Sequence, residues 1–83
     1  MKVKVLFFSV LQDIVGTDSL EIELSELESA TMDGLLIHFF TRFPELKAWE
    51  GRLLFAVNQE FAQRDTELTE GAEVAVMPPV QGG

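Results

Sequence analysis

Apolar and polar residues alternate in two stretches near the start of the chain. Residues 2–8 place valine and phenylalanine at every second position, and residues 19–24 place leucine or isoleucine between serine and glutamate. A period of two residues is typical of β-strands with one face buried. The pattern therefore predicts two paired strands, with the second at an edge of the sheet because its outward positions, Glu21 and Glu23, are charged.

A helical period begins after Thr31, the expected N-cap. Apolar residues recur at spacings of three and four at Met32, Leu35, Leu36, Phe39, Phe40 and Phe43. They form one broad apolar face that must be buried, and Pro44 is expected to end the helix near Phe43. Leu46 and Trp49 are expected to fold back over the end of the core.

Shorter patterns predict the other elements. We expect a short helical turn at 10–15 closed by Gly16, strands at 53–57, 61–62 and 73–77, and turns at 58–60 and 65–71. One main helix can cover only one face of the sheet. The fold class is therefore α+β, a mixed four- to five-stranded sheet packed on one main helix. The first and last strands are apolar on both faces, so we expect them to lie parallel at the centre.

The predicted sheet is apolar on its second face as well. The side toward the helix takes Val3, Val5, Phe7, Phe55, Val57, Val74 and Val76, and the opposite side takes Leu6, Phe8, Leu54, Ala56, Phe61, Ala75 and Met77. An open sheet face is normally polar. An exposed apolar patch of this size indicates a protein interface. The alternatives are that a loop or the tail covers this face, or that the register is different.

The chain ends in Pro78, Pro79, Val80, Gln81, Gly82 and Gly83. Two prolines favour a stiff, extended exit from the last strand. Two glycines make a thin peptide that can enter a channel too narrow for side chains. The only reactive group of this tail is the terminal carboxylate of Gly83. We therefore divide the chain into a domain at 1–77 and an extended tail at 78–83.

Composition excludes several classes of function. The net charge is −8, from 14 acidic and 6 basic residues, which disfavours nucleic acid as a partner. There is no cysteine, and His38 is the single histidine, so neither a metal site nor a nucleophile–base pair is expected. The apolar run at 5–11 is too short to span a membrane and lacks a cleavage site. We expect a soluble cytoplasmic protein without a membrane partner, and a substrate or carrier for an enzyme.

The sequence from Leu68 to Gly83 carries a family resemblance. It reads Leu-Thr-Glu-Gly-Ala-Glu-Val-Ala-Val-Met-Pro-Pro-Val-Gln-Gly-Gly. This stretch, together with Val5-Leu6-Phe7-Phe8 and Ala56-Val57-Asn58-Gln59, resembles the small-subunit family of molybdopterin synthase, whose members are sulfur carriers with the ubiquitin-like β-grasp fold. The resemblance extends over essentially the whole chain.

The resemblance implies a reaction and its partners. An adenylating enzyme would use ATP to activate the Gly83 carboxylate, and a sulfur donor would convert it to a thiocarboxylate. The tail, ending in Gly82 and Gly83, would then enter the large subunit of molybdopterin synthase and give its sulfur to a pterin precursor within a heterotetramer. Phe8, Phe61 and Met77 would face that partner, as would the tail residues Pro78, Pro79, Val80 and Gln81. The chain would bind no cofactor or metal itself and would be a non-catalytic subunit.

Two positions depart from the family pattern, and three other interpretations stay open. Ala72 replaces the usual acidic residue, and Gln12 lies where many members have arginine.

The chain can also be a sulfur carrier of another pathway, such as the thiamine pathway, although Pro78-Pro79 argues against it. It can be a ubiquitin-like protein modifier joined to lysines through Gly83. Finally, it can be an interaction domain with an inert tail.

Overall fold

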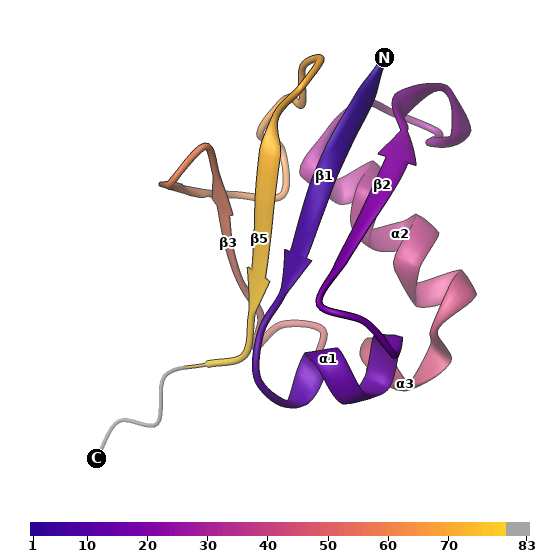
Figure 1. Ribbon diagram of the computed structural model, residues 1–83, viewed down its shortest axis with the longest axis vertical. Coiled ribbons are helices and arrows are strands. Elements are labelled where there is room, and N and C mark those ends of the chain that lie inside the picture. Colours follow the sequence, from indigo (N-terminus) through magenta and orange to yellow (C-terminus); the bar gives the residue numbers. More distant parts are fainter. Residues whose placement is uncertain (80–83) are drawn as a thin grey trace.

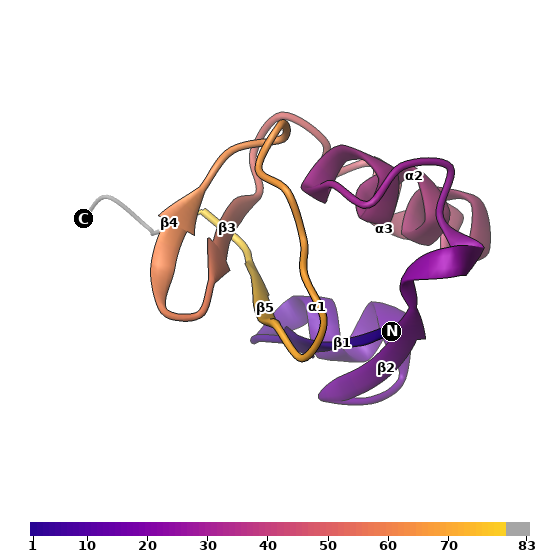
Figure 2. The same cartoon turned by 90° about the horizontal axis from the view of Figure 1, so that it is seen from above.

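A computed structural model describes residues 1–79 of the chain (Figure 1). Its elements are β1 (Lys2–Phe7), α1 (Val10–Val15), β2 (Ser19–Glu23), a 3₁₀ turn (Leu24–Glu26), α2 (Met32–Arg42), α3 (Pro44–Lys47), β3 (Leu54–Val57), β4 (Glu60–Ala62) and β5 (Glu73–Met77). The five strands form one sheet in the order β2-β1-β5-β3-β4. Helices α2 and α3 lie over one face of it (Figure 2).

The sheet topology confirms the predicted strand arrangement. β1 and β5 run parallel, with Val5 beside Val74 and Phe7 beside Val76. β2 pairs antiparallel with β1 at one edge of the sheet. The fold is therefore the α+β sandwich expected from the sequence, with a mixed five-stranded sheet.

Helix α2 begins where its free backbone donors find acceptors. The Thr31 hydroxyl accepts the N–H of Gly34 at 3.2 Å, which confirms the predicted N-cap. The N–H of Met32 donates to the Thr66 carbonyl at 2.9 Å, and the N–H of Asp33 donates to the Arg64 carbonyl at 2.7 Å. The segment around 64–68 is thereby tied to the start of the helix.

The end of α2 differs in one respect from the prediction. Pro44 stops α2 after Arg42 as expected, but the chain begins the short helix α3 at this same residue. Proline suits the first turn of a helix because its missing N–H would have no intrahelical acceptor there. Leu46 on α3 is fully buried, and Trp49 packs against the core, as the sequence predicted.

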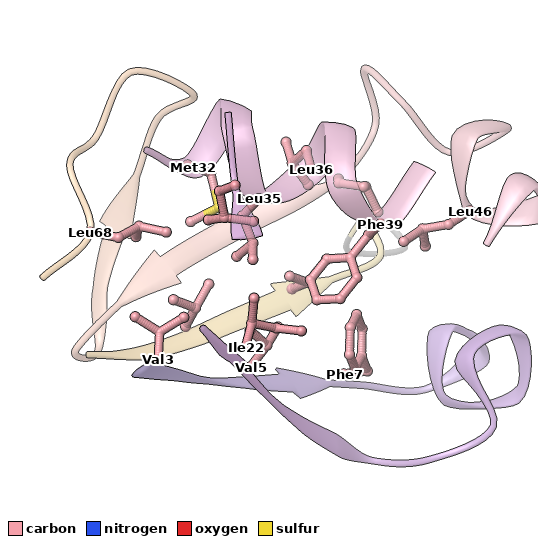
Figure 3. Close-up of a cluster of buried hydrophobic side chains, with 14 of the residues drawn as sticks. Val3, Val5, Phe7, Ile22, Met32, Leu35, Leu36, Phe39, Leu46 and Leu68 are labelled. Atoms are coloured by element: carbon pink, nitrogen blue, oxygen red, sulfur yellow. The ribbon is translucent and has the colours of Figure 1, made fainter. Parts of the chain in front are cut away.

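The core lies between the sheet and α2 (Figure 3). Val3, Val5 and Phe7 of β1 are at most 1% exposed, which confirms the predicted inward face. The ring of Phe7 meets the ring of Phe39 edge to face, with centroids 5.2 Å apart. Such an aromatic pair adds to the stabilisation that comes from burying the apolar area of the two rings. All residues of the buried cluster lie between Val3 and Val76.

Gly34 occupies a position on α2 that has no room for a larger side chain. A Cβ atom at this position would overlap the carbonyl oxygen of Ser29 and lie 2.8 Å from its Oγ. We expect Gly34→Ala to destabilise the fold by about 2 kcal/mol, since backbone must move to relieve the overlap. This loss exceeds the gain of about 1 kcal/mol that alanine brings to a helix. Urea unfolding monitored by circular dichroism measures the difference.

The control for this substitution lies on the same helix. Thr41 is exposed, and its hydroxyl donates a hydrogen bond to the Ile37 carbonyl one turn earlier. Thr41→Ala is expected to change the free energy of unfolding by less than about 0.5 kcal/mol. If Gly34→Ala were as stable as Thr41→Ala, the close approach of Ser29 would not explain the glycine.

Candidate functional site

The sheet face opposite α2 carries two apolar rows. In the first row, Leu6 lies beside Ala75, Ala75 beside Ala56, and Ala56 beside Phe61. In the second row, Met77 lies beside Leu54. Phe8 directly follows Phe7, the partner of Val76, so it comes next to Met77. We call this surface the apolar face and define it as Leu6, Phe8, Leu54, Ala56, Phe61, Ala75 and Met77.

The apolar face is accessible in the part of the chain that the structure describes. Phe61 is 84% exposed and Phe8 is 41% exposed, and the other five residues are half-buried. None of the seven belongs to the buried core cluster. The face assignment made from the sequence is therefore confirmed, and within residues 1–79 the face is not covered.

A tight turn positions Phe61. β3 and β4 are joined by Asn58 and Gln59, both with positive φ, 52° and 72°. Two such residues in succession match the twist of a hairpin. The Asn58 side-chain oxygen accepts the backbone N–H of Glu73 at 3.0 Å, and the backbone N–H of Asn58 donates to the Glu73 carbonyl at 2.8 Å. These bonds fasten the hairpin to β5 and hold Phe61 in line with Ala56.

The tail leaves from the margin of the apolar face. Because β1 and β5 are parallel, Phe8 and Met77 lie at the same end of the sheet, where residues 78–79 depart (Figure 1). Pro78 and Pro79 are half-buried, and neither has an N–H to continue the strand pairing. Val80, Gln81, Gly82 and Gly83, which the sequence also assigns to the site, lie outside the described residues.

An ion-pair cluster lies apart from this face. The Arg64 guanidinium bonds to Asp33 of α2 at 2.7 Å and to Glu50 at 3.0 Å. The hydrogen bond from Arg64 lowers the pKa of the Glu50 carboxyl below its ordinary value. Burial opposes the charge of Arg64, but its bonds to Glu50 and Asp33 outweigh this effect and raise its pKa. The cluster ties the loop before β5 to α2, which is a structural role.

His38 also lies on the helix side of the molecule. The sequence predicted a surface histidine; the side chain is half-buried, with its ring centroid 5.6 Å from that of Phe39. Its Nε2 atom is buried and has no hydrogen-bond partner among residues 1–79. In the same described part of the chain, acidic residues and His38 do not gather into a metal-binding group. Nor does any helix there have the length and apolar character needed to cross a membrane.

The backbone conformation of Ser9, near this face, had no signal in the sequence. It connects β1 to α1 with φ 58° and ψ −133°, a conformation that serine seldom adopts. The Phe8 carbonyl accepts the N–H of Leu11 at 3.1 Å, and the Ser9 carbonyl accepts the N–H of Gln12 at 3.0 Å. The chain therefore reverses sharply just after Phe8, which places α1 against the end of β1.

The fold and sequence match known proteins over the whole chain. The molybdopterin synthase sulfur carrier subunit of Escherichia coli is 40% identical over 83 residues, covering 98% of this chain and 99% of that protein. The putative molybdopterin converting factor subunit 1 of Pyrococcus furiosus superposes with a TM-score of 0.83 at 32% identity, covering 96% of this chain and 99% of that one.

A third match comes from a solved assembly. In the Helicobacter pylori complex of subunits 1 and 2 of the molybdopterin-converting factor, one chain superposes with a TM-score of 0.69 at 25% identity, and each chain is covered completely. The architecture is thus the ubiquitin-like β-grasp of sulfur carriers. The model of the ThiS family matches residues 5–83. Since this match includes all but the first four residues, the chain belongs to the ThiS family.

Proposed function

We propose that this chain is the sulfur carrier subunit of a molybdopterin synthase. Its Gly83 carboxylate is adenylated, converted to a thiocarboxylate, and used to donate sulfur to a pterin precursor. The observation that carries the proposal is the apolar face, which runs to the point where the tail departs at Met77. The full-length similarity to the Escherichia coli sulfur carrier subunit supports the pathway.

The chemistry explains why the chain needs enzymes to act on it. A carboxylate is a poor electrophile. Attack of the Gly83 carboxylate on the α-phosphate of ATP releases pyrophosphate and leaves an acyl-adenylate with AMP as leaving group. Hydrosulfide delivered by a sulfur donor then attacks the acyl carbon and displaces AMP, which leaves the thiocarboxylate. The adenylating enzyme and the sulfur donor supply the reactive groups of these steps, and this chain supplies Gly82 and Gly83.

The partner that receives the sulfur is proposed to be the large subunit of the synthase. A protein that covers the apolar face would remove the exposed side chains of Phe8 and Phe61 and the half-buried side chain of Met77 from water. It would also stand next to the start of the tail, because Pro78 and Pro79 directly follow Met77 at the end of β5. The acidic surface of the chain favours a partner with a basic face. We place these steps in the cytoplasm, where ATP is supplied.

Intact-mass spectrometry tests this function. The chain is incubated with its adenylating enzyme, ATP and a sulfur donor, with a sample lacking ATP as the control. We expect a mass gain equal to one sulfur atom replacing one oxygen, and fragmentation should place it at Gly83. The same spectrum before incubation establishes that Gly83 is the terminal residue.

Two results would contradict the proposal. A loaded mass that appears equally without ATP would show that adenylation does not activate Gly83. Covalent adducts on the lysines of other proteins, without a thiocarboxylate form of the free chain, would indicate a protein modifier instead.

A further inference from the structure

The end of β1 presents Phe8 to the apolar face, and its backbone has few partners in the sheet. The N–H of Phe7 donates to the Asp18 carbonyl at 2.9 Å, at the far end of the β1–β2 pairing. On the other side, β5 ends at Met77, and Pro78 has no N–H to offer. The last two carbonyl groups of this segment, those of Phe7 and Phe8, therefore need hydrogen-bond donors from elsewhere.

Helix α1 supplies both missing donors. The N–H of Leu11 donates to the Phe8 carbonyl at 3.1 Å. The side-chain Nε2 of Gln12 donates to the Phe7 carbonyl at 3.0 Å, in a partly buried position. Of these two bonds, only the second depends on the identity of a side chain. It spans the strained connection at Ser9 and links the first turn of α1 directly to the residue before Phe8.

Gln12 also lies beside the apolar face. Together with Lys4, Leu6, Phe8 and Ser19, it lines a hollow of about 220 Å³ on that side of the sheet. Phe8 therefore lines the same hollow as Gln12, and the direction of its side chain depends on the backbone at residues 7–9. A hydrogen bond that fixes the Phe7 carbonyl thus also fixes the backbone at Phe8, from which the Phe8 ring extends.

We propose that Gln12 is a positioning residue of the docking surface, which holds Phe8 in its partner-binding orientation by donating a hydrogen bond to the Phe7 carbonyl. This inference rests on the proposed function for the identity of the partner. Its structural part concerns the free chain alone. The Gln12 side chain forms its hydrogen bond within this chain, and it contributes to partner binding through the orientation of Phe8.

The test replaces Gln12 with methionine, which has a similar length and no N–H donor. In the free protein, we expect the backbone amide and ring signals of Phe8 and the amide of Ser9 to shift or broaden in NMR spectra. Affinity for the purified large subunit of molybdopterin synthase, measured by calorimetry, should fall about fivefold, as is usual for the loss of one partly buried hydrogen bond. Asp13→Ala, at an exposed position of the same helix, is the control and should change neither quantity.

A double-mutant cycle separates positioning from direct contact. When Phe8 is first replaced by alanine, Gln12→Met should weaken binding by less than about twofold, because no ring remains to be positioned. A full fivefold loss in the Phe8→Ala background would overturn the proposal, since Gln12 would then act independently of Phe8. Unchanged Phe8 and Ser9 signals in free Gln12→Met would overturn it as well. If the unaltered chain did not bind the large subunit, the proposed function would fail, and the NMR comparison would still decide the structural part.

Discussion

Replacing Met77 with aspartate is expected to weaken binding to the large subunit of molybdopterin synthase by at least about 100-fold. Met77 lies between Phe8 and Leu54 in the apolar face and is half-buried in the free chain. A partner that covers the face would remove the new carboxylate from water and enclose it among apolar side chains such as Phe8 and Leu54. In the free chain the carboxylate keeps access to water, so the free energy of unfolding should change by only about 1 kcal/mol. Calorimetric titration and urea unfolding measure the two quantities.

Ile37→Asp is the matched control for this substitution. Ile37 is an exposed apolar residue on α2, with 40% of its surface accessible, and it lies on the helix side of the sheet. Both variants change the net charge from −8 to −9. Ile37→Asp should bind the large subunit as the unaltered chain does. Equal losses for both variants would point to long-range repulsion, and full affinity of Met77→Asp would contradict docking through the apolar face.

The sequence predicted those elements whose pattern is repeated several times. The alternation at 2–8 and the helical periodicity of apolar residues at 32–43 each rest on many side chains, so both patterns predicted burial correctly. The apolar face followed from the same alternation, because every inward residue of a strand determines an outward neighbour. The β1–β5 pairing could be inferred because both strands are apolar on both sides.

Features that depend on single residues were not predictable in this way. Pro44 was expected only to end a helix. Its missing N–H and fixed φ end α2, but the same two properties suit the first turn of α3. Ser9 has a positive φ of 58°, and a positive φ is predictable from sequence mainly where the residue is glycine. The Gln12 bond to Phe7 depends on how α1 folds back, which the local sequence does not reveal. The roles of Gly82 and Gly83, and the division of the chain after residue 77, stay predictions.

Deleting Gly83 is expected to reduce thiocarboxylate formation by at least about 100-fold while leaving the fold intact. The carboxylate would retreat by one residue, and a displacement of this size removes a reacting atom from the position that an enzyme has prepared for it. The described domain has its own core cluster, from Val3 to Val76, so we expect it to fold without Gly83. Loading is measured by intact mass after incubation with the adenylating enzyme, ATP and a sulfur donor, and stability is measured by thermal unfolding.

Two companion proteins make the Gly83 deletion informative. Ile37→Asp retains the whole tail and should load as the unaltered chain does, which controls for a change on the protein surface. A chain extended by one glycine after Gly83 keeps the Gly-Gly pair but moves the carboxylate outward, and it should lose loading as the deletion does. If the extended chain loaded normally, the position of the carboxylate would not matter. A large fall in the melting temperature of the deletion would contradict the expected independence of fold and loading, because the tail would then stabilise the domain.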